Sequence, residues 1–193
     1  MPDFNNEYGK LVEQAQKKAQ EQAKIQNDAA TTTQEYLAPD KSFSFDYRSN
    51  WQTATQPIGS GKPMFSAYKT NGLSLLASAF LIVKDAGTKN ENDAIEQYKN
   101  FIWAQNQETK ISEYKTTNGS QIIQVIEFGN AGTSSTTQTP EQMEKTAFIS
   151  TNGKVYLISV TIMQNIQDIS READDIFKSI SITEQGTAQT TNP

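Results

Sequence analysis

The sequence predicts an α+β domain: an antiparallel β-sheet of about six or seven strands, built from three hairpins, with helices packed on both faces and a helical tether in front. Three observations lead to this prediction. The pair Asn-Gly occurs three times between apolar runs, the runs carry apolar residues on both faces, and two other segments carry apolar residues at helical spacing.

The hairpins are predicted from Asn71–Gly72, Asn118–Gly119 and Asn152–Gly153. A two-residue type I′ turn needs a positive φ at both central residues, and Asn and Gly adopt that conformation at little cost. Apolar residues recur in the runs that flank each pair. The pairs therefore predict three two-residue turns and six strands.

The strands are expected to be covered on both faces. In the run after Gly72, Leu81 and Val83 point to one face while Phe80 and Ile82 point to the other. A sheet with one face in water shows a cleaner alternation than this. Elements other than strands must therefore cover the second face.

The first covering helix is predicted over residues 92–107, with Asp93 and Glu96 in a capping-box-like start. A second helix is predicted near the C-terminus. Their apolar stripes are Ala94, Ile95, Tyr98, Phe101 and Ile102 in the first, and Ile166, Ile169, Ala173, Ile176, Phe177 and Ile180 in the second.

The chain is predicted to divide into a polar helical tether or linker (1–40), an α+β domain (41–183) and a disordered tail (184–193), because aromatic and branched residues concentrate in the middle part. The N-terminal helix has a narrow, alanine-rich stripe between Tyr8 and Ala23. It is expected to be a solvated tether, or else to dock on the domain or self-associate. Residues 1–30 show no signal peptide, and an anchor before Met1 stays open.

The composition excludes several classes of function. The chain has no Cys and no His, which removes disulfides, thiol nucleophiles, Ser-His-Asp triads and the usual His-bearing zinc sites. The formal net charge of −5 argues against nucleic acid as a partner. We therefore expect no enzyme, no cofactor and no nucleic-acid binding; a carboxylate-based enzyme is the competing hypothesis.

Candidate site residues come from two stretches. Residues 84–96 are rich in oxygen ligands, and Asp85, Glu91 and Asp93 are the candidates for a weak divalent-metal site, although the spacing is not that of an EF-hand. Trp103 lies off the apolar stripe of its helix, so it either packs against a helix edge or loop or contributes to an exposed partner-binding patch.

Other conspicuous residues have structural interpretations. Glu172, Asp174 and Asp175 are predicted to form a solvated helix face, since adjacent helical residues point in different directions. Trp51 ends an apolar strand and is predicted to be core. Residues 59–63 lack the spacing of a phosphate-binding loop and are predicted to be an ordinary loop.

Four stretches carry a resemblance to a known family. They are FSFDYRSNW (43–51), IIQVIEF (122–128), EKTAFISTNGKVYLISVTI (144–162) and DDIFKSISI (174–182). In this order they resemble the PsbP-like domain over roughly residues 41–183, with Arg48 where the family usually has Pro. Metal ligands proposed for plant members include His and are not carried over to this chain.

The resemblance implies a domain that works by docking onto larger assemblies, as do the family members that assist photosystem II or bind the small GTPase Ran. The bacterial extracytoplasmic branch fits the polar ends best. We therefore expect a non-catalytic, monomeric module on the extracytoplasmic side of a bacterial membrane that binds a protein or envelope component. Membrane contact is expected only through an anchor outside this chain; a Ran-type GTPase-binding factor is the third hypothesis.

Overall fold

The computed structural model describes residues 17, 31–56, 62–70, 77–105, 109–119, 121–130, 142–163 and 166–183. Contacts divide the chain into two units, residues 1–34 with 48–50 and residues 35–47 with 51–193. In the first unit the Ser49 N–H donates to the Thr32 carbonyl at 2.8 Å.

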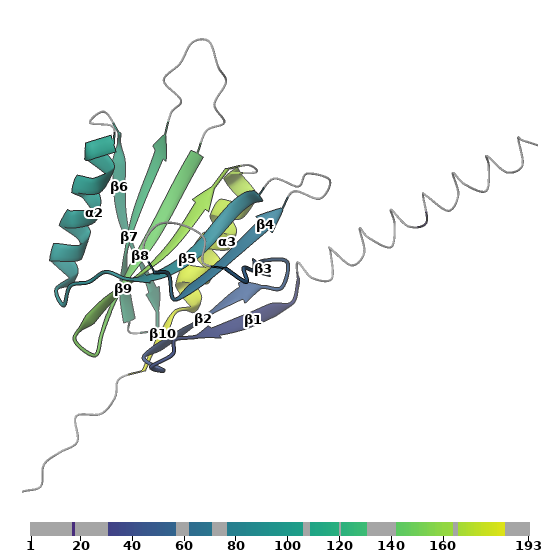
Figure 1. Cartoon of the computed structure of the whole chain (residues 1–193), viewed down its shortest axis with the longest axis horizontal. Helices are drawn as coiled ribbons and strands as arrows, with labels where there is room; N and C mark the ends of the chain where they lie inside the picture. The colour runs from purple at the N-terminus through teal and green to yellow at the C-terminus, as the bar shows by residue number, and fades with distance from the viewer. Residues whose placement is uncertain are drawn as a thin grey trace, which may run out of the picture. The chain divides into compact units, whose positions relative to one another are not determined.

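Two antiparallel sheets and two helices make up the described fold (Figure 1). The large sheet has seven strands in the order β3-β4-β5-β9-β8-β7-β6, and the small sheet has the order β1-β2-β10. The large sheet contains β3 (Gln52–Thr53), β4 (Phe65–Thr70), β5 (Ala77–Asp85), β6 (Ile111–Asn118), β7 (Gln121–Asn130), β8 (Gln142–Thr151) and β9 (Lys154–Ile162). The remaining elements are β1 (Thr33–Leu37), β2 (Phe43–Arg48), β10 (Ser181–Ile182), α2 (Glu91–Gln105) and α3 (Ile166–Ser179).

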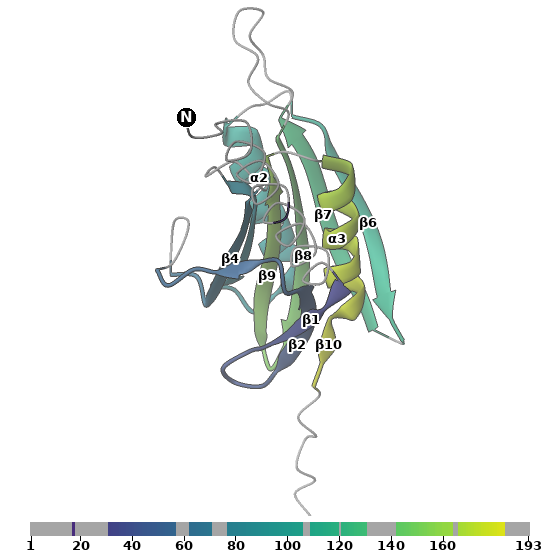
Figure 2. The same cartoon turned by 90° about the vertical axis from the view of Figure 1, so that its right-hand side faces the viewer.

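Helices α2 and α3 cover opposite faces of the large sheet, which confirms the predicted architecture (Figure 2). Alternate strand residues enter separate core clusters: on β8, Ala147 and Ile149 face α3, whereas Phe148 faces α2. Aromatic residues of β2 such as Phe43 and Phe45 join the cluster on the α3 side. Residues on both faces are therefore apolar because each face has its own core.

The third hairpin turn is as predicted. Asn152 and Gly153 both have positive φ, 51° and 68°, and Thr151 pairs with Lys154 across the two-residue loop. The second turn is displaced by one residue, since Asn118 still belongs to β6 and pairs with Gln121. Gly119, with φ of 60°, is then the first central residue, the position at which a type II′ turn places Gly.

The first turn, at Asn71–Gly72, lies outside the described residues, although β4 and β5 pair antiparallel as predicted. The same holds for most of the predicted N-terminal helix and for residues 184–193. Strand β5 is described from Ala77 onward. No helix of the described part has the length and apolar character needed to cross a bilayer.

We expect Gly153→Val to lower the free energy of unfolding by about 1–2 kcal/mol, the cost of the left-handed conformation for an L-residue. No atom lies within 4 Å of the position of an added Cβ, so the whole effect comes from the φ of 68°. Urea denaturation measures it. Gly153→Asn is the matched control, because Asn tolerates this conformation; equal losses in both variants would contradict the strain argument.

The two helices begin close to the predicted positions, but the cap of α2 differs. The side-chain oxygen of Asn90 accepts from the backbone N–H of Asn92 at 2.9 Å and of Asp93 at 3.4 Å. Asn90 is therefore the N-cap. The prediction that Asp93 and Glu96 form a capping box is wrong. The loop that leads into the helix places the side-chain oxygen of Asn90 where the free N–H groups of the first turn need an acceptor.

The small sheet was not expected from the sequence. Strand β10 pairs with β2 through Ser181 with Ser44 and Ile182 with Phe43, so the aromatic opening strand does not join the large sheet. Tyr36 of β1 is also buried in the α3-side core. The compact unit therefore includes residues upstream of the predicted boundary at residue 41.

Candidate functional site

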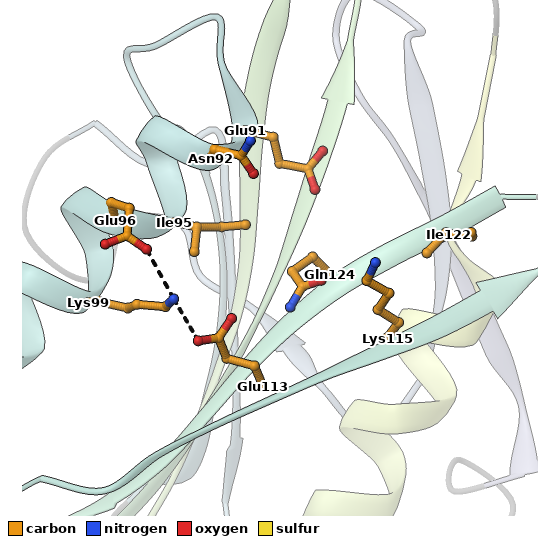
Figure 3. A pocket seen from close by; sticks show the side chains of 9 residues that line it. All are labelled: Glu91, Asn92, Ile95, Glu96, Lys99, Glu113, Lys115, Ile122 and Gln124. Carbon is orange, nitrogen blue, oxygen red and sulfur yellow. Dashed lines mark hydrogen bonds and ion pairs between the residues drawn. The ribbon is translucent and has the colours of Figure 1, made fainter.

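A pocket of about 320 Å³ opens between helix α2 and the edge of the large sheet (Figure 3). Helix α2 forms one wall, strand β6 the other, and strand β7 the floor. The residues that line it are Glu91, Asn92, Ile95, Glu96, Lys99, Glu113, Lys115, Ile122 and Gln124. The pocket therefore combines both signs of charge, two amides and two isoleucines.

Lys99 ties the two walls together. Its Nζ lies 2.6 Å from Oε1 of Glu113 on β6 and 3.1 Å from Oε1 of Glu96 on α2. The hydrogen bond to Glu113 is the largest cause of the raised pKa of Lys99, with burial opposing it. The Lys99 side chain is 13% exposed and that of Glu113 is 42% exposed, so the bridge joins α2 to β6 at a partly solvated part of the pocket.

Glu91 and Lys115 lie on opposite walls and differ from Lys99 in having no direct partner. Among the described residues, neither side chain makes a hydrogen bond or an ion pair within 4.0 Å. Burial raises the pKa of the Glu91 carboxyl, and the charge of Lys115 opposes that rise. The two charges thus influence each other across the pocket without touching.

The apolar part of the pocket is formed by one buried and one exposed isoleucine. Ile95 of α2 is 8% exposed, whereas Ile122 of β7 is 64% exposed. Trp103 lies one helical turn beyond Lys99, on the same side of α2, and is 40% exposed. Phe101, 60% exposed, lies about 200° around the helix from Trp103, by the 3.6-residue repeat.

The three predicted metal candidates do not meet around one point. Asp85 ends β5 and its Oδ1 accepts the N–H of Gly87 at 2.8 Å, while Asp93 is exposed on the first turn of α2. Glu91 alone lines the pocket. Within the described ranges, no group of three or more acidic residues is arranged to hold a metal ion.

The sequence predicted that Asp174 lies on a solvated helix face, and this prediction is wrong. Its Oδ1 accepts from Lys145 Nζ at 2.8 Å and from the Tyr114 hydroxyl at 2.8 Å. Lys145 is only 4% exposed and also lies 3.4 Å from Glu127 Oε2. The carboxylate turns inward because a lysine buried on the sheet needs a counter-charge.

The prediction of a solvated helix face is also wrong for Glu172. It is 6% exposed and accepts from Lys69 Nζ at 2.6 Å and from the indole N–H of Trp51 at 3.2 Å. Trp51 itself is 2% exposed, so its predicted place in the core is confirmed. These polar groups fasten α3 to Lys69 on strand β4 and to Trp51, which lies between β2 and β3, so the charge has a structural use.

Several buried or partly buried tyrosines have raised pKa values. Tyr98, between α2 and β8, donates to Glu144 Oε1 at 2.5 Å, and burial followed by the Glu144 charge raises its pKa well above the ordinary value. Burial and the Asp174 hydrogen bond raise the pKa of Tyr114. Burial is also the main cause of pKa values of about 12 for Tyr36 and Tyr156.

The pocket escaped prediction because Glu91, Lys115 and Gln124 come from three elements whose packing no short pattern reveals. Lys145 did leave a signal in the sequence. It alternates with Met143 and Ala147 on one face of a strand, and a charge at such a core-facing position indicates a buried partner. The partner itself, Asp174, could only be found from the structure.

Comparison with known proteins gave structural matches only. No family model and no curated protein matches the sequence. Cyanobacterial PsbP (CyanoP) from Synechocystis sp. PCC 6803 matches with a TM-score of 0.51 and 11% identity, over 79% of this chain and 93% of that one. The Ran-binding protein Mog1p of Saccharomyces cerevisiae matches with a TM-score of 0.50 and 9% identity, over 79% and 96%.

A third solved structure, from Bacteroides thetaiotaomicron VPI-5482, has a TM-score of 0.48 and 15% identity; the match covers 79% of this chain but only 49% of that one. The described chain thus corresponds to about half the length of that protein. At these identities a structural match establishes the fold and not the activity. The antiparallel sheet covered by helices on both faces, together with the likeness to CyanoP and Mog1p, shows that the chain has the PsbP-like fold.

Proposed function

We propose that this chain is a non-catalytic binding module that docks onto a protein partner through the α2–β6 surface, defined as Trp103 and the adjoining pocket. The observation that carries the proposal is the 40% exposure of Trp103 on the flank of α2 that also forms the pocket wall. Exposed Trp is enriched at the centres of protein interfaces, since it buries a large area and keeps a polar N–H.

The surface is continuous along the helix. Trp103 follows Lys99 by four residues and Glu96 by seven, and both of those residues line the pocket. Strand β6 is the outermost strand on this side of the sheet, so its outer backbone groups add hydrogen-bonding capacity beside the same flank. A partner seated here meets an aromatic anchor, a charged rim and a strand edge together.

A non-catalytic role is supported by the residues available for chemistry. The sequence has no His and no Cys, so no imidazole base or thiol nucleophile serves a reaction. The acidic residues Glu172 and Asp174 are engaged by Lys69, Trp51, Lys145 and Tyr114. The likeness to Mog1p, a Ran-binding protein, supports protein binding as the mode of action.

We also propose an extracytoplasmic location, with the residues that precede β1 acting as a tether to an anchor encoded upstream. The polar, alanine-rich composition of that segment supports a spacer more than a packed element. Gene sequence upstream of Met1 tests this part directly. A lipobox or an apolar spanning segment encoded there supports the proposal. A gene that encodes no export signal upstream overturns it.

Docking is tested by placing a photo-crosslinking p-benzoyl-L-phenylalanine at position 103 of the full chain and incubating it with envelope extract from the source cell. A discrete protein adduct is expected. The same probe at Phe101 is the matched control, because Phe101 lies on the opposite flank of the same helix and is 60% exposed. An adduct of lipid or glycan mass, equal labelling at both positions or no adduct would each contradict the proposal.

The identified partner then allows a quantitative test. We expect Trp103→Ala to weaken its binding by at least about 2 kcal/mol, roughly thirtyfold in Kd, the loss typical of a central interface Trp. The unfolding midpoint should change little because the side chain is 40% exposed. A Trp103→Ala chain that binds as well as the unmodified chain would show that the interface lies elsewhere.

A further inference from the structure

The pocket contains two opposite charges that the fold brings near each other but does not pair. Glu91 on α2 and Lys115 on β6 line it from opposite walls, with the Gln124 amide on the floor between them (Figure 3). Other charged groups in the same pocket are paired, since Lys99 contacts both Glu96 and Glu113. The contrast marks Glu91 and Lys115 as groups open to a ligand.

We propose that this pocket binds a small zwitterion of dipeptide size, which carries a free amine, a free carboxylate and an aliphatic side chain. The pocket belongs to the α2–β6 surface proposed above, but the ligand is assigned from the pocket interior alone and not from Trp103, so its test gives a result whether or not a protein docks on this surface. Each feature of the ligand follows from a feature of the pocket.

The amine is assigned to Glu91. Its carboxylate is partly buried and receives no hydrogen bond from the described residues, so it has lost water without gaining a donor. The raised pKa of Glu91 reflects that loss. An ammonium group placed against it supplies the missing donors and forms a charge-assisted hydrogen bond.

The carboxylate of the ligand is assigned to Lys115. This lysine is on the edge strand β6, directly opposite Gln124 of β7 in the strand register. Its ammonium and the Gln124 amide both reach into the pocket (Figure 3). A carboxylate can accept from both donors, while the amide oxygen of Gln124 remains available for a peptide N–H.

The aliphatic side chain is assigned to Ile95 and Ile122. Ile122 is 64% exposed, the largest exposed fraction among the large hydrophobic side chains described. Covering it removes apolar surface from water at a gain of roughly 25 cal/mol per Å². An aliphatic group suits these two side chains, because both are branched and neither offers an aromatic face for stacking.

Two magnitudes set the size of the ligand. The pocket volume of about 320 Å³ is at the lower end of small-molecule sites. Glu91 and Lys115 form no direct ion pair, so a ligand can lie between their charges. A dipeptide spans roughly 7 Å between its termini when extended, enough to bridge charges that are not in contact.

The test uses glycyl-leucine and two blocked forms, N-acetylglycyl-leucine without the amine charge and glycyl-leucinamide without the carboxylate. Each is titrated into the isotope-labelled full chain while the Gln124 side-chain amide and the Ile95 backbone amide are followed by NMR. We expect saturable binding of glycyl-leucine and at least about tenfold weaker binding of both blocked forms. No saturation up to about 10 mM, or equal affinity for all three, overturns the proposal.

Two variants assign the ends. Glu91→Gln should weaken glycyl-leucine at least about tenfold and leave N-acetylglycyl-leucine unchanged, whereas Lys115→Met should weaken glycyl-leucine and leave glycyl-leucinamide unchanged. Lys154→Met is the control, since this exposed lysine lies in the β8–β9 hairpin outside the pocket. Equal effects of all three variants would reduce the binding to general charge attraction and overturn the site.

Discussion

Phe177→Ala is expected to lower the free energy of unfolding by about 3–5 kcal/mol, the range for truncating a buried Phe. Phe177 lies on α3 and is 0% exposed, within the core that joins α3 to the large sheet and to β2 of the small sheet. Removing the ring leaves a cavity between three elements that the polar contacts of Lys145 and Glu172 hold in place, so the site cannot collapse freely.

The matched control for Phe177→Ala is Phe101→Ala. The same substitution on α2 removes a ring that is 60% exposed, so the change should stay within about 0.5 kcal/mol. Urea denaturation followed by far-UV circular dichroism measures both. Similar losses in the two variants would mean that α2 and α3 had been assigned the wrong degree of burial.

Raising the pH above 10 is the second change with a large expected effect. Tyr98 is partly buried, packed against the core on the α2 side, and its pKa is raised well above the ordinary 10.0, mainly by burial and by the charge of Glu144. Tyr36 and Tyr156 have pKa values raised to about 12. The unfolded chain therefore releases tyrosine protons that the folded chain retains.

The sign of the pH effect follows from this difference in bound protons. Below pH 10 both states keep their tyrosine protons, so these groups cause no pH dependence; above it the unfolded state binds fewer protons, and stability falls as pH rises toward the folded pKa values. Each tyrosine that stays protonated only in the folded state removes about 1.4 kcal/mol per pH unit. Urea midpoints from pH 9 to 11.5, with tyrosinate absorbance at 295 nm, follow the loss.

Tyr98→Phe is the control for the alkaline transition. This variant loses the hydrogen bond to Glu144 but cannot ionise, so the slope of stability against pH above 10 should be shallower by about 1.4 kcal/mol per unit even where the absolute stability is lower. A slope that is unaffected by Tyr98→Phe, or no fall in stability between pH 10 and 11, would show that Tyr98 is accessible to water in the folded state.

Local signals explain how much of the fold was predictable. The Asn152–Gly153 turn and the start of α2 near residue 92 depend on neighbouring residues, and both positions were predicted closely. At the second hairpin the pair Asn118–Gly119 predicted the turn, yet the register moved it by one residue because Asn118 pairs with Gln121. Strand register depends on packing across the sheet, which the turn residues alone do not encode.

The site was less predictable than the fold because its residues meet only through tertiary packing. Trp103 was recognisable as an off-stripe residue from helical periodicity alone, and it is 40% exposed; its place in an interface is a proposal that the crosslinking experiment tests. Lys115 and Gln124, in contrast, are paired on the neighbouring strands β6 and β7. They line the same pocket as Glu91, which lies on helix α2. Burial of Glu172 was equally hidden, since its partners lie in distant strands and loops.

The order of strands has a consequence for how the chain is made. Strand β10, which pairs with β2 through Ser181 and Ser44, is the last described strand to be synthesised, and the Trp51–Glu172 contact joins residues 121 positions apart. At a ribosomal speed of about 5–20 residues per second, Trp51 waits roughly 6–24 s for Glu172 to be added. For that interval the aromatic strand β2 lacks the C-terminal elements that it packs against. This topology therefore favours slow folding that is completed largely after synthesis, and the nascent chain is expected to need protection by chaperones.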